Sequence, residues 1–256
     1  MYPVLFKFGN ISVYSYGLML SLAFLAAIYT AVRRARIINI NSQVILDLGL
    51  VVILSGIIGA RIFFILLNLD FYINNPVQII RLDKGGLAVF GGVLFSMVTV
   101  SVFCRVRKIN VWDIADVIAP SIALGQAIGR IGCFLNGCCW GVPTNLPCGV
   151  IFRHREIMPE EFHCIPLHPV QLYNSFLNLL IFFILTRIFS KRRSKGEVFA
   201  FYLILHPFMR FWTEFLRGDN GKAFFNLTVF QLVSIFLCVL GIVMLCVVKS
   251  RKSFHI

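Results

Sequence analysis

The chain has 256 residues, of which 59% are hydrophobic and only 14% are charged. A soluble domain carries about 25% charged residues, and the mean hydropathy here is +0.86. This composition excludes intrinsic disorder, a fibrous repeat and an ordinary cytosolic globule, because a soluble fold cannot hide so much apolar surface. It predicts an all-α, polytopic integral membrane protein that forms a single membrane-embedded domain over residues 1–256.

The net charge of +13 arises from 24 Lys and Arg against 11 Asp and Glu. These charges lie between apolar runs instead of forming one patch, which favours a membrane and not nucleic acid as the partner. A helix needs about 20 apolar residues to cross the bilayer core. Seven candidate spans are Ser15–Val32, Ile45–Leu67, Leu87–Phe103, Ile114–Phe134, Val170–Ile188, Val198–Phe215 and Leu227–Val248. Polar residues interrupt the fourth and the sixth, and the first starts too late to be a removable signal peptide.

The distribution of basic residues predicts the orientation. Fourteen Lys and Arg fall on one side of a seven-span arrangement, seven on the other, and three within spans. The richer side is expected to be cytoplasmic. The N-terminus is therefore predicted outside and the C-terminus in the cytoplasm, with exterior loops at about 68–86 and 135–169.

Two arginines within spans raise different alternatives. An Arg at the bilayer centre costs about 2.5–3.5 kcal/mol, so it usually faces protein or a watery cavity. Arg61 lies near the outer end of the second span, where it can simply reach the interface. Arg130 has no acid within one helical turn and lies among Gly125, Gly129 and Gly132, which allow close approach of a backbone or a ligand. A lipid phosphate suits its guanidinium; backbone carbonyls are the alternative.

The third arginine within a span belongs to a polar helical face. His206, Arg210, Glu214 and Arg217 are spaced by four, four and three residues, which places them on one side of a helix. Glu214 can neutralise one arginine but not both. The pattern indicates either a buried ion pair that fixes helix packing or an anion site with spare positive charge.

The segment Gly129–Gly141 (GRIGCFLNGCCWG) resembles the signature Gly-Arg-x-Gly-Asn-Phe-x-Asn-x-Glu-x-x-Gly of the prolipoprotein diacylglyceryl transferases. The resemblance covers nearly the whole chain and implies seven helices with the N-terminus outside. It implies transfer of diacylglyceryl from phosphatidylglycerol to the lipobox cysteine thiol of exported precursors, in the bacterial cytoplasmic (inner) membrane. Other similar stretches are Tyr16–Met19, Gly59–Arg61, Lys84–Gly92, His168–Tyr173, Arg210–Arg217 and Leu227–Ser234.

The resemblance also suggests roles for individual residues. Arg130 and Arg210 would hold the phosphate, Glu214 would orient Arg210, and Asn136 would contact the head group. His206 is a candidate base, although it could equally be a packing residue if positive charge alone lowers the substrate thiol's pKa. Further candidate substrate-binding residues are Tyr16, Arg61, Gly141, His168, Gln171, Tyr173 and Arg217. The partners would be phosphatidylglycerol, lipobox-containing precursors and membrane lipids, with no nucleic acid, metal or other cofactor.

Four positions depart from the family pattern. Phe90 stands where many members have a His that has been proposed as a base, and Phe cannot take a proton. Cys133 and Cys138 replace the signature's Asn and Glu, and His206 replaces a common Tyr. The phosphate-binding residues thus match the family, whereas the residues that would handle the proton differ.

The eight cysteines allow several interpretations. Cys104, Cys238 and Cys246 are expected to be apolar packing residues. A disulfide between Cys148 and Cys164 would constrain the second exterior loop.

Cys138 and Cys139 suggest a redox or metal site. The interpretation of these cysteines as small residues on a packed turn is favoured over a redox or metal site, because neither a CxxC pair nor clustered His residues accompany them. Two functions compete with the transferase: a membrane thiol oxidoreductase using Cys133, Cys138 and Cys139, and a non-catalytic lipid-binding or transport bundle.

Overall fold

The computed structural model describes residues 2–8, 11–81, 85–152, 159–221 and 226–253. Lys84, the first residue of one family-like stretch, lies outside them. The chain forms two compact units, Met1–Ala31 with Ala115–Ile256, and Val32–Ile114. The prediction of a single membrane-embedded domain stays a prediction.

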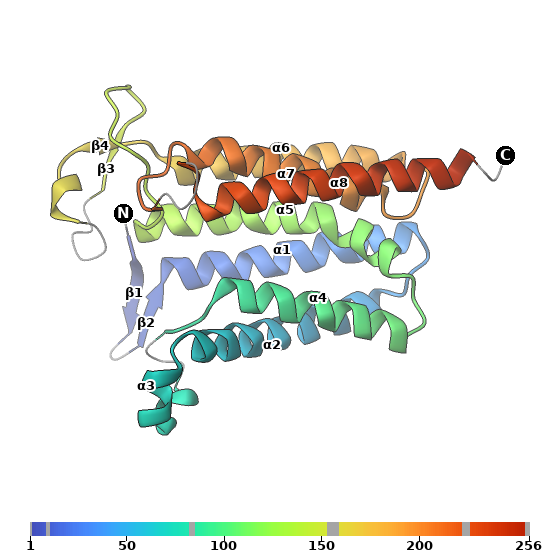
Figure 1. The fold of residues 1–256 in the computed structure, drawn as a ribbon, viewed down its shortest axis with the longest axis horizontal. Coiled ribbons are helices and arrows are strands. Elements are labelled where there is room, and N and C mark those ends of the chain that lie inside the picture. Colours follow the sequence, from blue (N-terminus) through green and yellow to red (C-terminus); the bar gives the residue numbers. More distant parts are fainter. Residues whose placement is uncertain (1, 9–10, 82–84, 153–158, 222–225, 254–256) are drawn as a thin grey trace. The chain divides into compact units, whose positions relative to one another are not determined.

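Long helices dominate the structure, as the composition predicted (Figure 1). They are α1 (Ser15–Ile37), α2 (Ser42–Leu67), α4 (Val89–Val106), α5 (Val111–Asn136), α6 (Val170–Ser190), α7 (Glu197–Glu214) and α8 (Val229–Ser253). The segments predicted as exterior loops contain the short helices α3 (Leu69–Asn74), η1 (Pro76–Ile79) and η2 (Glu160–Phe162).

Two antiparallel hairpins were not predicted. One pairs β1 (Val4–Phe8) with β2 (Ile11–Tyr14), and the other pairs β3 (Val150–Ile151) with β4 (Pro166–Leu167). The strands are too short to show a periodic pattern in the sequence.

Six helices in the described part of the chain are long and apolar enough to cross a membrane: α1, α2, α4, α5, α6 and α8. The protein is therefore a multi-pass membrane protein. The remaining long helix, α7, has 18 residues and includes Glu197, Arg210 and Glu214, so its composition alone does not mark it as a span. The count of seven spans and the orientation of the termini stay predictions.

Small residues allow the helices of the first unit to pack closely. A Cβ on Gly125 of α5 would lie 3.6 Å from the backbone oxygen of Ala23 in α1, an ordinary contact distance, so an alanine would also fit at this close approach of α5 and α1. Further along the same two helices, the hydroxyl groups of Thr30 in α1 and Ser121 in α5 lie 2.9 Å apart. Helices α6, α7 and α8 lie side by side (Figure 1). Such close approach is how helices associate where lipid removes the hydrophobic driving force.

A buried carboxylate joins α5 to the start of α7. Asp116 is fully buried and accepts hydrogen bonds from the backbone N–H of Gly196 at 2.8 Å and of Phe199 at 2.9 Å. Its carboxylate also pairs with Arg192 at 3.0 Å. A negative charge at a helix N-terminus satisfies N–H groups that lack intrahelical partners. Asp116 therefore fixes α7 against α5 at the end opposite to Asn136.

In the second unit, glycines bring α2 and α4 together. A Cβ on Gly59 would lie 2.3 Å from the Cβ of Phe95, and one on Gly91 would lie 2.2 Å from the Cβ of Phe63. Both distances are impossible for real atoms, so only glycine fits. Part of the family-like glycine pattern is thus explained by helix packing. Phe90 is half-exposed on α4 of this unit.

Arg61 is buried in the second unit, and its place at the membrane interface stays a prediction. Its guanidinium lies 5.3 Å from the ring centroid of Tyr72 and donates all five of its N–H groups to backbone carbonyls. The acceptors are the oxygens of Gln78, Ile79, Arg81, Gly85 and Gly86, at 2.5–3.0 Å. With every donor used, Arg61 holds the segment before α4 and has none left for a lipid phosphate.

Candidate functional site

Helices α5, α6, α7 and α8 line a cavity of about 190 Å³ in the first unit. The lining residues are Gln126, Arg130, Asn178, His206, Pro207, Arg210, Phe230, Val233, Ser234 and Leu237. The structure thus brings the three predicted catalytic residues, Arg130, His206 and Arg210, to one chamber. The chamber combines two cationic groups with apolar walls from α8.

Arg210 is held from one side only. Its Nη2 pairs with Oε2 of Glu214 at 2.8 Å, and its guanidinium lies 5.2 Å from the ring centroid of Phe230. The carboxylate of Glu214 is itself fixed, since Oε1 accepts from the hydroxyl of Thr228 at 3.2 Å and from the amide of Asn220. The other arm of Arg210, Nη1, is buried and has no hydrogen-bond partner among the residues described. A donor that is oriented, buried and unused is suited to an anionic ligand.

Arg130 is half-buried and makes no hydrogen bond or ion pair with any residue that the structure describes. The alternative in which backbone carbonyls saturate this arginine is therefore wrong for Arg130; Arg61 shows that arrangement instead. Glu214 balances the charge of Arg210. The charge of Arg130 is left over, so the chamber carries net positive charge.

His206 is positioned by α6. Its Nδ1 lies 3.1 Å from Oδ1 of Asn178, and the amide nitrogen of Asn178 donates to the backbone oxygen of Asn174 at 2.7 Å. Since the amide nitrogen of Asn178 is engaged by Asn174, it is the amide oxygen that faces the ring of His206. An amide oxygen can only accept a hydrogen bond, so Nδ1 of His206 carries the proton and donates it. The ring stacks on Tyr202 at 5.4 Å. His206 therefore has a fixed tautomer whose Nε2 can accept a proton.

Arg217 does not share the helical face of the other three polar residues, which corrects the prediction. Helix α7 ends at Glu214, and backbone bonds over three residues, such as Arg217 N–H to Glu214 O at 3.1 Å, tighten the chain into a turn. The side chain of Arg217 makes a two-point pair with Asp219, at 2.8 and 2.6 Å.

Sequence reasoning missed Asp219, although an acid two residues after an arginine was a visible signal. The pKa of Arg217 is raised. Burial opposes its charge, but the hydrogen bonds from the guanidinium to Asp219 and the electrostatic attraction of Cys139 and Asp219 outweigh that cost. Arg217 is thus a charge already neutralised, unlike Arg130.

Gly141 has a packing role. Its N–H donates to the backbone oxygen of His168 at 3.1 Å, and a Cβ in its place would lie 2.6 Å from that same oxygen. His168 Nδ1 lies 3.3 Å from the hydroxyl of Tyr173, which in turn lies 3.2 Å from Sγ of Cys148. Cys148 and Cys164 are both free thiols, so the predicted disulfide is not formed.

Two other predicted binding residues lie around the end of α5. Gln171 is buried, and its amide donates to the backbone oxygen of Cys138 at 2.7 Å. Tyr16 lies at the start of α1, where its ring would meet a Cβ on Gly132 at 3.5 Å. Asn136 is the last residue of α5. These residues surround the turn that follows α5 and do not line the chamber.

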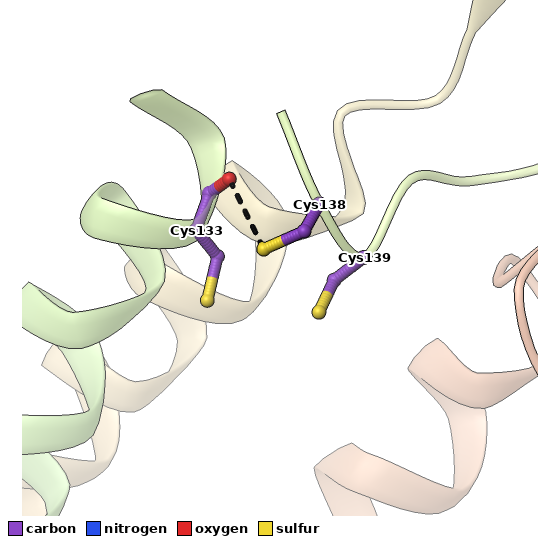
Figure 2. Close-up of side chains that lie close together, drawn as sticks. All are labelled: Cys133, Cys138 and Cys139. Atoms are coloured by element: carbon purple, nitrogen blue, oxygen red, sulfur yellow. Dashed lines mark hydrogen bonds between the residues drawn. The ribbon is translucent and has the colours of Figure 1, made fainter. Parts of the chain in front are cut away.

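That turn gathers three cysteines. Sγ atoms of Cys133, Cys138 and Cys139 all lie within 4.8 Å of one another, and Figure 2 shows the three side chains close together at the end of α5. The pKa of the Cys139 thiol is lowered, first by hydrogen bonds from Cys133 and Cys138 and then by the positive charges of Arg217 and Arg130. The favoured interpretation of a merely packed turn did not anticipate this proximity.

Comparison with known proteins agrees with these observations. The family model described as prolipoprotein diacylglyceryl transferase matches residues 3–247. The chain belongs to the prolipoprotein diacylglyceryl transferase family. A phosphatidylglycerol–prolipoprotein diacylglyceryl transferase of Clostridium tetani is 34% identical over 99% of this chain and 100% of its own length. That of Finegoldia magna is 34% identical over 98% and 96%, and a second such enzyme of Clostridium perfringens is 30% identical over 98% and 97%.

Membership of the transferase family makes the departures from its pattern more informative. All three predicted catalytic residues line the chamber; by the resemblance described above, Arg130 and Arg210 fit the family pattern, whereas His206 stands in place of a common Tyr. Cys133 and Cys138 replace family Asn and Glu within the cluster next to Arg130. Phe90 and Arg61 belong to the second compact unit.

Proposed function

We propose that this protein transfers the diacylglyceryl group of phosphatidylglycerol to the lipobox cysteine thiol of exported precursor proteins, in the cytoplasmic (inner) membrane of a bacterium. The names of the relatives support the reaction and both substrates. The observation that carries the proposal is the chamber, in which Arg130 has no ion pair among the described residues and Nη1 of Arg210 is buried without a partner.

The chamber is chemically suited to a phosphodiester that arrives with acyl chains. A buried donor without a partner costs about 1–3 kcal/mol, so a ligand that fills it gains that energy back. Guanidinium binds phosphate oxygens through paired hydrogen bonds. Apolar residues of α8, such as Val233 and Leu237, line the same chamber. Positive charge beside an apolar wall matches a lipid head group joined to its chains.

In the proposed reaction, the substrate's sulfur attacks the glyceryl CH₂ carbon that bears the phosphate. The carbon–sulfur bond of the thioether forms while the carbon–oxygen bond breaks, and its electron pair leaves on glycerol phosphate. Charge therefore grows on the departing phosphate oxygens. Arg130 and Arg210 stabilise this transition state more than the ground state, which is what accelerates a reaction.

The proton of the substrate thiol also has to leave. A free cysteine has a pKa of about 8.5, and only the thiolate is reactive. His206 is the titratable base of the chamber, and its Nε2 is available because Nδ1 is engaged by Asn178. In this proposal the proton moves from the thiol to Nε2 of His206 and then to the released phosphate monoester.

Mass spectrometry of the product tests the proposal. The purified protein in detergent is mixed with phosphatidylglycerol and a lipobox peptide, and we expect a peptide heavier by one diacylglyceryl group together with released glycerol phosphate. A peptide with Ser in place of its Cys is the control and should stay unmodified. Release of glycerol phosphate without modified peptide, or no reaction with any phosphatidylglycerol, would contradict the proposed function.

A further inference from the structure

The three-cysteine cluster is built by a reversal of the chain. Cys133 belongs to the last turn of α5, while Gly137 at φ 80° and Cys139 at φ 63° turn the backbone so that Cys138 and Cys139 come back toward it. The turn is anchored, since Gln171 donates to the backbone oxygen of Cys138 at 2.7 Å. The thiol of Cys138 also donates to the backbone oxygen of Cys133 at 3.7 Å (Figure 2). The sulfur positions are therefore set by the fold.

The spacing of the sulfurs suits a tetrahedral metal ion. With zinc–sulfur bonds of about 2.3 Å, two thiolates of a tetrahedral site lie about 3.8 Å apart. All three Sγ atoms of the cluster already lie within 4.8 Å of one another, so shifts of about 1 Å or less would complete the ligand set. No His, Asp or Glu of the described residues joins this group. Three protein ligands with one position left is the pattern of a catalytic zinc ion, whereas structural sites are closed by four.

The positive charges near the cluster are compatible with a zinc ion only because the thiolates reverse its charge. Arg130 and Arg217 both act electrostatically on Cys139, and a bare dication would be repelled by them. Three thiolates outweigh the two charges of Zn²⁺, however, so the occupied site carries one negative charge. Nearby guanidinium groups attract a complex of that sign. Arg130 and Arg217 would therefore stabilise the occupied site electrostatically.

We propose that Cys133, Cys138 and Cys139 bind Zn²⁺ as three thiolates and leave a fourth coordination position for the thiol of the precursor's cysteine. The role of the fourth position rests on the proposed function. A thiol that coordinates zinc loses its proton outright, so the metal would supply the reactive thiolate. This activation needs no histidine at position 90, where the chain has Phe.

The position of the cluster relative to the chamber fits this chemistry. Arg130 precedes Cys133 by three residues on α5 and therefore lies about one turn away along the same helix; it also lines the lipid chamber. The attacked carbon is joined to the phosphate through one oxygen. A phosphate held by Arg130 thus brings its glyceryl carbon near a sulfur bound at the fourth position.

Atoms and charges balance in the transfer. The substrate thiol releases its proton on binding zinc, its sulfur forms the bond to the glyceryl carbon, and the carbon–oxygen pair leaves with glycerol phosphate. The released proton matches the additional negative charge of the phosphate monoester. A thioether carries no charge and binds zinc more weakly than a thiolate, so the product leaves and the three protein thiolates remain.

Metal analysis of the purified full chain tests the binding site. We expect about one zinc ion per chain after purification without chelator, loss of that zinc in Cys139→Ser and in the triple Cys→Ser variant, and retention in Cys246→Ser. Cys246 is exposed on α8 and provides a matched control. Retained helical circular dichroism shows that the variants fold. Absence of zinc in the parent chain, even after addition of one equivalent, or unchanged zinc in the triple variant, would overturn the site.

Cobalt substitution tests the fourth position. Co²⁺ bound by three thiolates gives sulfur-to-metal absorption, and its visible bands should change when a lipobox peptide binds but not when the Ser-containing peptide is added. Unchanged bands with the Cys peptide would refute the fourth-ligand role even if zinc is bound. Activity separates the two proposals. A metal-free triple variant with full transferase activity refutes the zinc role alone, whereas a zinc-loaded chain that forms no thioether refutes the proposed function alone.

Discussion

Replacement of Arg210 by Lys tests the chamber most directly. Lysine keeps the positive charge and can still pair with Glu214, but it lacks the second arm whose Nη1 is buried without a partner. The variant therefore removes the donor assigned to the phosphate and leaves the charge in place. It separates two-point phosphate binding from a simple requirement for positive charge.

The expected loss follows from that one donor. A hydrogen bond to a charged group contributes about 1.5–3 kcal/mol, and each 1.36 kcal/mol is a factor of ten in rate. Arg210→Lys should therefore lower kcat/KM by about 10- to 150-fold. Because the charge on the phosphate grows in the transition state, most of the loss should appear in kcat and not in KM.

The assay measures kcat and KM for thioether formation from phosphatidylglycerol and a lipobox peptide. Arg192→Lys provides the matched control, since Arg192 pairs with Asp116 away from the chamber and this variant keeps its charge; kcat/KM should stay within about twofold. An unchanged kcat/KM in Arg210→Lys would refute the assignment of Nη1. An equal loss in both variants would instead indicate general destabilisation.

Three further predictions follow from the same contacts. If His206 takes the thiol proton, His206→Ala should lower kcat/KM by about 10²–10⁴-fold and remove the acid limb of the pH–rate profile; if the cysteine-bound metal takes that task, activity and limb should stay unchanged, which excludes His206 as the base. Gly141→Ala should lower stability in detergent by about 1–3 kcal/mol, measured by thermal unfolding, because its Cβ would lie 2.6 Å from the oxygen of His168; Gly129→Ala, with no heavy atom within 4 Å of the added Cβ, should lose less. Asp116→Asn should cost about 2–3 kcal/mol by removing a buried charge with three donors, and an unfolding midpoint equal to that of the parent chain would contradict this.

Apolar run length predicted the helices well, because burial in lipid demands both apolar side chains and satisfied backbone hydrogen bonds. The predicted span Val170–Ile188 corresponds to α6, Val170–Ser190, and Ile45–Leu67 to α2, Ser42–Leu67. The fourth span was predicted too short, since α5 starts at Val111 and continues to Asn136. Hydropathy marks the apolar part of a helix, whereas the helix itself ends where its backbone bonds end.

The site could be predicted only where partners are close in the sequence. The spacing of four between Arg210 and Glu214 predicted a shared helical face, and the structure pairs them at 2.8 Å. The contact of His206 with Asn178 joins two helices, and no local pattern encodes it. The position of Arg217 off the helical face could not be predicted either, because α7 ends through backbone hydrogen bonds of a turn and not at a change in composition.

The residues that fit the family pattern are those assigned to phosphate binding, whereas the residues that differ from it are those assigned to removal of the thiol proton. A phosphodiester with growing charge needs donors of fixed direction, and guanidinium supplies them better than any other side chain, which explains why Arg130 and Arg210 match. Removing a proton from a thiol makes no such demand on residue type, since a histidine, a metal ion or a cluster of positive charge can each do it. A phenylalanine at position 90, where many members have His, is therefore compatible with activity only if another group removes the proton of the substrate thiol. His206 and the cysteine cluster beside Arg130 are two such groups, and the metal analysis together with the His206→Ala profile decides between them.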